Sequence, residues 1–388
     1  MRIKLEEFAM EQLIIFDGNS ILNRAFYGVR PLSTGEGLPT NAVFGFVNIL
    51  HRALQSVGGS PEYAAIAFDV KAPTFRHKAC EFYKANRKGM PEDLAVQLPY
   101  AKEVASALGL TVVEMPGYEA DDVIGTLTRL FSEKGVNCVI VTGDRDSFQL
   151  VNDRVTVHLA ANNETRITGV KEIFEQYGLA PKSLIQVKAI MGDTSDNIPG
   201  VAGIGEKGAV KLIKEYGDVE GIYANIQNIK GALHDKLMAG KEMAYTSRFL
   251  AEIDCHVPMD LTDESYEYHG EDVSALRTLY TKLEFRKLLE QLPTEESAPK
   301  ADAPQVDYLP ATAEQADRVA VYAMEDAGSL FAEGKTILLW SVKDTLHLLK
   351  EKNVPMAAQT EDLSLLAYLA SPADNGISFA GAVFRITE

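Results

Sequence analysis

Apolar runs and helical patterns alternate along the first half of the chain. Strands are predicted where short apolar runs occur, at residues 13–16, 63–68, 110–114, 138–141 and 155–159. Between these runs, apolar residues recur at helical spacing over residues 43–56, 93–108 and 120–133. Alternation of this kind is typical of a mostly parallel sheet with helices on both faces. We therefore expect an α/β domain over residues 10–178.

The pattern changes after residue 170, where short helical segments follow one another without strands. They are predicted at residues 171–177, 182–191, 207–215, 219–224 and 241–251, so residues 179–292 form a helical subdomain. Residues 293–307 have the composition of a linker. A smaller, partial α/β domain is expected over residues 308–388, with a strand at 336–340 and helices at 344–352 and 362–369.

Composition narrows the class of protein. The 388 residues are 46% hydrophobic, which is enough for more than one buried core. The three cysteines, Cys80, Cys138 and Cys255, form no CxxC pair and suggest neither a disulfide framework nor a zinc site. The start of the chain does not look like a signal peptide, and no segment approaches the roughly 18 apolar residues of a membrane span. These observations predict a cytoplasmic protein with no membrane partner.

Charge is distributed unevenly along the chain. The formal net charge of -17 argues, by itself, against a nucleic-acid partner. Residues 71–90, however, hold six Lys or Arg against one acid, whereas residues 295–388 hold 7 Lys or Arg against 15 Asp or Glu. Because DNA recognition depends on local patches of charge, a basic groove for DNA is compatible with a negative net charge of the whole chain.

Nine carboxylates stand where predicted strands end and helices begin. They are Asp17, Asp69, Glu119, Asp121, Asp122, Asp144, Asp146, Asp193 and Asp196. The carboxyl ends of parallel strands line one crevice, so these residues are expected to converge there and to repel one another unless cations lie between them. Acids at a helix N-terminus alone could serve the helix dipole, but the partners from other strands favour hard divalent metals, Mg²⁺ or Mn²⁺.

A glycine-rich run, Gly203-Ile204-Gly205-Glu206-Lys207-Gly208, matches GxGxxG letter for letter. A dinucleotide site would need this motif to follow a strand, and here it follows a predicted helix. We interpret it as a helix-hairpin-helix turn, whose glycines let backbone amides approach the phosphates of duplex DNA. Gly200, Gly203 and Gly205 would form the turn, and Lys207 and Lys211 would add charge contacts.

Several motifs together resemble a known family. The runs are Phe16-Asp17-Gly18-Asn19, Phe75-Arg76-His77-Lys78, Pro116-Gly117-Tyr118-Glu119-Ala120-Asp121-Asp122, Thr142-Gly143-Asp144-Arg145-Asp146 and Gly192-Asp193-Thr194-Ser195-Asp196-Asn197-Ile198-Pro199-Gly200-Val201. They are similar to the 5′ nuclease domain of bacterial DNA polymerase I, in the flap endonuclease superfamily. The resemblance covers residues 13–292 and implies a PIN-like fold.

The resemblance implies two metal sites, with Mg²⁺ as the expected ion and Mn²⁺ as a substitute. Asp17, Asp69, Glu119 and Asp121 would hold one ion, with Asp122 in or near that shell. Asp144, Asp146 and Asp193 would hold the second, supported by Asp196. Two such ions can activate a water and stabilise the leaving oxygen during displacement at phosphorus. The resemblance also implies K⁺ at the hairpin, on carbonyls around Val201 and Ile204.

The basic segment at about residues 71–92 would form an arch over the active site. Four of its residues would lie along one side of a helix if the segment is helical, although a solvated basic face explains the composition equally well. By the resemblance, Lys84 and Arg87 would grip the scissile phosphate as catalytic groups, Tyr83 would stack on a base, and Arg76 would guide the strand.

The sequence therefore predicts a structure-specific 5′ nuclease of replication and repair, acting as a monomer on 5′ flaps, nicks, gaps and RNA–DNA primer junctions. A PIN-class ribonuclease and a catalytically silent junction-binding module are the alternatives. The C-terminal piece resembles the start of the 3′-5′ exonuclease-like domain of polymerase I. It lacks an early DxE pair, so we expect it to be inactive.

Overall fold

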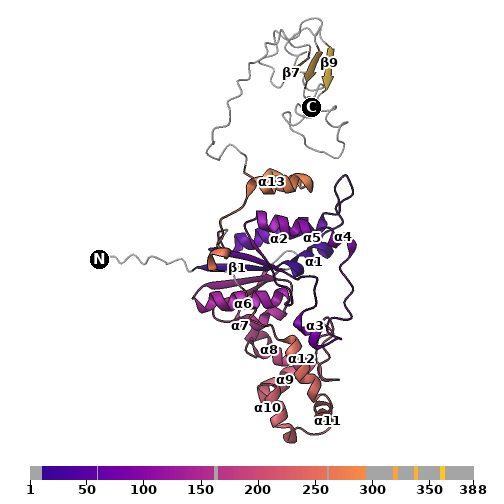
Figure 1. Cartoon of the computed structure of the whole chain (residues 1–388), viewed down its shortest axis with the longest axis vertical. Coiled ribbons are helices and arrows are strands. Elements are labelled where there is room, and N and C mark those ends of the chain that lie inside the picture. Colours follow the sequence, from indigo (N-terminus) through magenta and orange to yellow (C-terminus); the bar gives the residue numbers. More distant parts are fainter. Residues whose placement is uncertain are drawn as a thin grey trace, which may run out of the picture. The chain divides into compact units, whose positions relative to one another are not determined.

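The computed structural model describes residues 11–58, 60–160, 165–259 and 262–293, and three strands further on. Its centre is a six-stranded sheet, which contains the strand labelled β1 in Figure 1, and the strand order is β3-β2-β1-β4-β5-β6. The strands are β1 (Gln12–Asp17), β2 (Tyr63–Phe68), β3 (Thr111–Glu114), β4 (Asn137–Thr142), β5 (Val155–Ala160) and β6 (Thr165–Thr168). Neighbouring strands pair in parallel except β5 and β6, which are antiparallel. The predicted mostly parallel sheet is thus confirmed.

Helices cover both faces of this sheet (Figure 1). One face carries α1 (Gly18–Gly28), α2 (Asn41–Ser56), α5 (Leu98–Ala107) and, outside them, α13 (Val273–Lys282) with α14 (Arg286–Gln291), around a core that includes Phe16 and Phe46. The other face carries α6 (Ala120–Glu133) and α7 (Val170–Tyr177), with Ile15 and Ile140 in its core. Successive strand residues point to opposite faces, which is why a continuous apolar run fills both cores.

The helical subdomain follows the sheet. It consists of α8 (Ser183–Met191), α9 (Glu206–Tyr216), α10 (Val219–Ala224), α11 (Ala232–Ala239) and α12 (Lys241–Ala251). Its own core includes Ile190, Val201, Leu212 and Ile222. The glycine-rich turn joins α8 to α9 and does not follow a strand. A dinucleotide site is therefore excluded, as predicted, because its GxGxxG motif must follow a strand.

The predicted elements differ from the observed ones in several places. The helical pattern at 93–108 is broken into α4 (Glu92–Ala95) and α5, because Pro99, in the first turn of α5, has no backbone N–H to donate to the Ala95 carbonyl. The basic segment is helical only over α3 (Phe75–Ala79), and turns follow at residues 81–86, so Arg76, Tyr83, Lys84 and Arg87 do not lie along one helix. Helices α1, α11, α13 and α14 and strand β6 were not predicted, and α13 and α14, which lie within the range predicted for the helical subdomain, pack on the sheet.

The remainder of the chain forms a second compact unit, residues 298–388, which holds β7 (Arg318–Val321), β8 (Thr336–Leu339) and β9 (Gln359–Asp362) in one parallel sheet. The predicted strand at 336–340 is confirmed in β8. The predicted linker and helices lie outside the described residues, apart from Pro293 at the start of the linker and Asp362, which ends β9. In the part of the chain that the structure describes, no helix is long and apolar enough to cross a membrane.

Candidate active site

Acidic side chains from four elements meet at the carboxyl edge of the sheet. Asp17 ends β1, and its two carboxylate oxygens accept from the Ser20 amide at 2.9 Å and from Oγ1 of Thr142, at the end of β4, at 2.7 Å. Asp69 follows β2 and accepts from the backbone N–H of Ala120, in the first turn of α6, at 2.8 Å. These hydrogen bonds hold β1, β2, β4 and α6 in register around one acidic cluster.

Asp121 has the least compensated carboxylate of the cluster. Its Oδ1 is buried and has no hydrogen-bond partner among the described residues. Burial, followed by the negative charges of Asp17, Asp144 and Asp146, raises the pKa of Asp121 well above its ordinary value. A buried carboxylate oxygen without a donor, set among like charges, is the environment that a bound cation stabilises.

Two other carboxylates have pKa values near neutrality. Burial is the main cause for Asp17, whose pKa is raised to about 7, with further contributions from Asp69 and Asp144. Burial and then the charge of Asp144 raise the pKa of Asp146 to about 6. Each raised pKa means that the surroundings of the carboxylate destabilise its ionised form.

Lys188, on α8, was missed by the sequence analysis. Its Nζ lies 2.6 Å from Oδ2 of Asp193 and also binds Asp146, so it bridges two of the predicted metal ligands. Burial would raise the pKa of Asp193, but hydrogen bonds from Lys188 and Ser195 outweigh this effect and lower it to about 2. In the sequence, Lys188 is a single lysine in a largely apolar helical segment, which is a weak signal; its 9% exposure is known only from the structure.

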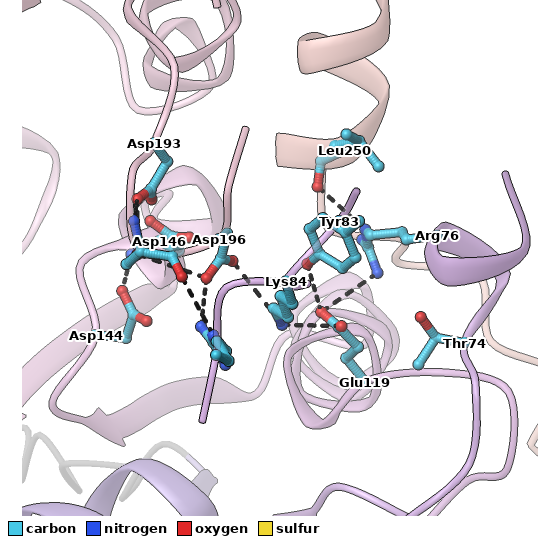
Figure 2. A network of polar contacts seen from close by, with 12 residues as sticks. Thr74, Arg76, Tyr83, Lys84, Glu119, Asp144, Asp146, Asp193, Asp196 and Leu250 are labelled. Carbon is cyan, nitrogen blue, oxygen red and sulfur yellow. Dashed lines mark hydrogen bonds and ion pairs between the residues drawn. The ribbon is translucent and has the colours of Figure 1, made fainter. Parts of the chain in front are cut away.

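The predicted arch residues reach the same cluster from α3 and the turns that follow it. Nζ of Lys84 lies 2.8 Å from Oε1 of Glu119 and 3.9 Å from Oδ2 of Asp196, so Lys84 stands between the two groups of acids (Figure 2). The phenol of Tyr83 donates to Oε2 of Glu119 at 3.0 Å, and Arg87 pairs with Asp196. The structure therefore brings both predicted catalytic cations to the acids.

Arg76 and Asp122 form a buried, bidentate ion pair, and Nη1 of Arg76 also lies 3.7 Å from Oε2 of Glu119 in the acidic cluster (Figure 2). The guanidinium donates to both carboxylate oxygens at 2.7 and 2.8 Å, and Asp122 also accepts from the amides of Glu119 and Asp254. Arg76 is 2% exposed and Asp122 is 0% exposed. Tyr83 is likewise buried, so base stacking by Tyr83 and strand guidance by Arg76 stay predictions that require both side chains to leave their present partners.

Metal ligation by the nine acids also stays a prediction. Within the described ranges, no group of three or more Asp, Glu, His or Cys side chains is already arranged to hold an ion. In the present contacts, Lys84, Arg87 and Lys188 neutralise four of the acids, Glu119, Asp196, Asp146 and Asp193. The donor set nevertheless fits a hard divalent cation, because it consists of carboxylate oxygens and includes the unpartnered Asp121 Oδ1.

The hairpin has the backbone that its glycines predicted. Gly200 and Gly203 have φ of 63° and 78°, in the left-handed region that only glycine enters readily. A Cβ on Gly200 would lie 2.3 Å from the amide nitrogen of Gly192, so no other residue fits there. Gly205 precedes α9, and Lys207 and Lys211 are exposed on that helix. The Val201 carbonyl accepts from the Ile204 amide at 3.1 Å, and the predicted K⁺ site is otherwise untested.

Two family models match the chain in succession. Residues 12–178 match the N-terminal, resolvase-like domain of the 5′-3′ exonuclease family, and residues 179–274 match its C-terminal SAM fold. The chain belongs to the 5′-3′ exonuclease family. The resemblance found in the sequence motifs, to the 5′ nuclease of the DNA polymerase I type, is thereby confirmed at the level of the family.

Relatives of this exonuclease chain agree with that assignment. It is 42% identical over 285 residues to DNA polymerase I of Caldicellulosiruptor bescii, covering 72% of the chain and 33% of the relative. DNA polymerase I of Bacillus caldotenax is 33% identical over 419 residues, covering 97% of the chain and 47% of the relative. The chain thus spans between a third and a half of these polymerases' length.

A solved structure shows the same fold. A flap endonuclease of bacteriophage T5, in a complex with DNA and metal ions, superposes with a TM-score of 0.52 at 21% identity. The match covers 72% of this chain and 98% of that one. The six-stranded sheet with its helical second domain is therefore the fold of a 5′ nuclease.

The raised pKa of Asp17 predicts how the metal-free exonuclease responds to pH. The folded protein holds this proton up to about pH 7 and the unfolded chain releases it near pH 4, so the stabilisation is complete below about pH 4 and is lost as pH rises through 7. We expect the free energy of unfolding, measured by urea denaturation in a chelator, to fall by a few kcal/mol over this window. Asp17→Asn should make this fall smaller, and the raised pKa values of Asp121 and Asp146 should account for the part that remains. A wild-type stability that rises between pH 4 and 7 in step with the variant would contradict the assignment.

Proposed function

We propose that this chain is a structure-specific, metal-dependent 5′ nuclease that hydrolyses phosphodiester bonds in 5′ flaps, nicked or gapped DNA and RNA–DNA primer junctions. Family membership supports the nuclease reaction. The observation that carries the metal-dependent part is the buried, unpartnered Oδ1 of Asp121 within the acidic cluster. Removal of RNA primers and repair of nicks are the roles that this specificity implies.

Eight of the nine acids would bind the two divalent cations. Asp17, Asp69, Glu119 and Asp121 would hold one, and Asp144, Asp146 and Asp193, supported by Asp196, the other. Asp122 is not included, because Arg76 occupies both of its oxygens. When bound, the ions supply an activated water and stabilise the leaving oxygen. We take Mg²⁺ as the ion used and Mn²⁺ as a substitute.

The chain's own cations would then serve the phosphate of the substrate. Lys84, Arg87 and Lys188 now neutralise carboxylates and would be free to bind phosphate oxygens once the acids are ligated. Lys84 stands between the two acidic groups, where it can neutralise charge on the scissile phosphate (Figure 2). This position supports a role for Lys84 in the chemical step as well as in binding.

Duplex DNA would bind at the hairpin between α8 and α9. Gly200, Gly203 and Gly205 leave the turn open to the phosphate backbone, and exposed Lys207 and Lys211 lie just beyond it on α9. We retain K⁺ at this turn as part of the proposal. The complex of the T5 flap endonuclease with DNA and metal ions supports such a partner for this fold. We further propose a monomer located in the cytoplasm, with an inactive exonuclease-like segment after residue 308.

Two alternatives make different predictions. A PIN-class ribonuclease would need the acids but neither the hairpin nor the arch residues, and both are built into this fold. A silent junction-binding module would need the basic elements without the acids. The test is cleavage of a 5′-labelled flap duplex beside a single-stranded RNA of the same sequence. Preference for the RNA would favour the first alternative, and binding of the flap without cleavage the second.

A further inference from the structure

A turn of the arch and the loop that leads to the hairpin are joined by uncharged hydrogen bonds. We call residues 82–87 the arch turn and residues 193–197 the linking loop. The Lys84 amide donates to the Asp196 carbonyl at 2.9 Å, the Asn86 side-chain amide donates to the Thr194 carbonyl at 2.8 Å, and the Asn197 side-chain amide donates to the Phe82 carbonyl at 2.6 Å. These bonds do not depend on the charges that metal ions and phosphate would redistribute.

The backbone at this junction is held in an unfavourable conformation on both sides. Among the described residues, the non-glycine positions with positive φ are Lys84, Asn197 and Glu284, with φ of 54°, 55° and 56°. Two of the three face each other across the arch turn and the linking loop. Asparagine tolerates this conformation, but lysine does so less readily, and such strain persists only where surrounding contacts enforce it.

The linking loop is in turn fixed to the hairpin. Asp193 and Ile198 exchange backbone hydrogen bonds at 2.7 Å in both directions, and the Gly200 amide donates to Oγ of Ser247 on α12 at 3.0 Å. Ile198 also packs with Tyr83, from the arch turn, and with Leu250 in one apolar cluster. The duplex-binding turn, the linking loop and the arch turn therefore form one continuous packed connection.

We propose that Asn197 is a positioning residue that latches the arch turn to the hairpin side of the protein and so holds Lys84 at the acidic cluster. The inference rests on the proposed nuclease function. Because the latch is uncharged, it keeps Lys84 in place while Glu119 and Asp196 exchange their lysine and arginine partners for metal ions. A duplex seated on the hairpin would thus be coupled to the residue that meets the scissile phosphate.

The test combines Asn197→Gly with Lys84→Ala. Glycine removes the side-chain amide but accepts positive φ, so the variant loses the latch without added backbone strain. Single-turnover cleavage of a 5′ flap should fall about tenfold in Asn197→Gly and further in Lys84→Ala, whereas the double variant should match Lys84→Ala within about twofold, since residues acting through one group are not additive. Multiplied losses in the double variant would overturn the latch, because they indicate independent effects.

A second readout does not require cleavage. The Lys84 amide is bonded to the Asp196 carbonyl, so hydrogen exchange of the peptide spanning the arch turn should accelerate in Asn197→Gly. Asn48→Ala is the matched control, because Asn48 makes the same kind of amide-to-carbonyl bond, 2.7 Å to Phe44, on α2. Unchanged exchange in Asn197→Gly would overturn the proposal. If the wild-type chain failed to cleave, the nuclease function would fall, while the exchange result would still decide the latch.

Discussion

Asp121→Asn is expected to abolish cleavage while making the metal-free protein more stable. Asp121 contributes a buried oxygen without a partner, and burial and neighbouring acids raise its pKa, so its charge is a cost to the fold. A neutral amide removes that cost, and we expect the melting temperature in a chelator at pH 8 to rise by a few degrees. The same change removes a metal ligand, so single-turnover cleavage should fall by on the order of 10³-fold, equivalent to several kcal/mol.

The opposite signs of these two effects distinguish a ligand from a structural acid. Asp153→Asn is the matched control, since Asp153 is an exposed acid outside the cluster, and neither property should change. A variant at Asp121 that lost stability while cleaving flaps at nearly the wild-type rate would show that the carboxylate supports the fold and not the reaction.

Arg76→Met is expected to destabilise the protein more than any change at the exposed surface. Asp122 would keep a fully buried negative charge with no cation beside it, and breaking one side of such a pair costs about 3–5 kcal/mol. At about 2–4 °C per kcal/mol for a domain of this size, the melting temperature should fall by roughly 10 °C. Adding Asp122→Asn should recover part of the loss, because the charge is gone and the amide oxygen can still accept from backbone N–H groups.

The control is Lys171→Met, which removes a cation from an exposed pair with Glu175 and should leave melting unchanged. The same variant also tests the prediction that Arg76 guides the 5′ strand. If Arg76→Met melted like the wild type but bound flaps more weakly, the side chain would act on DNA, and the buried pair would not be its main role.

Apolar runs located the strands of the sheet well, because a short, continuous apolar run is typical of a strand that is buried on both faces. All five predicted strands, β1 to β5, were found to within one residue at each end, and the acids that follow them could be expected to converge. Strand β6 was missed because it is a short edge strand with exposed Ile167 and no apolar run. Helix α1 was missed because it begins at Gly18, directly after the last residue of β1, so its glycine and asparagine looked like a loop.

Sequence patterns could not predict which side chains form ion pairs with each other. Arg76 and Lys84 lie close together in the chain, and composition gives both the same basic character. Both side chains contact Glu119, but tertiary contacts give Arg76 a second, fully buried partner, Asp122, and place Lys84 between Glu119 and Asp196. Lys188 likewise reads as an ordinary helix residue until α8 packs against the site. The motifs identified the acids, but only the folded arrangement shows which cations face them.

The most direct test of the account is Mg²⁺-dependent cleavage of a 5′-labelled flap duplex by the purified chain, beside an Asp144→Asn variant. We predict cleavage near the junction that requires Mg²⁺ or Mn²⁺ and is lost in the variant, although the variant still binds the flap. If the wild-type chain bound the flap and left it intact with either ion, the two-metal nuclease would be contradicted and the silent junction-binding module would be the better account.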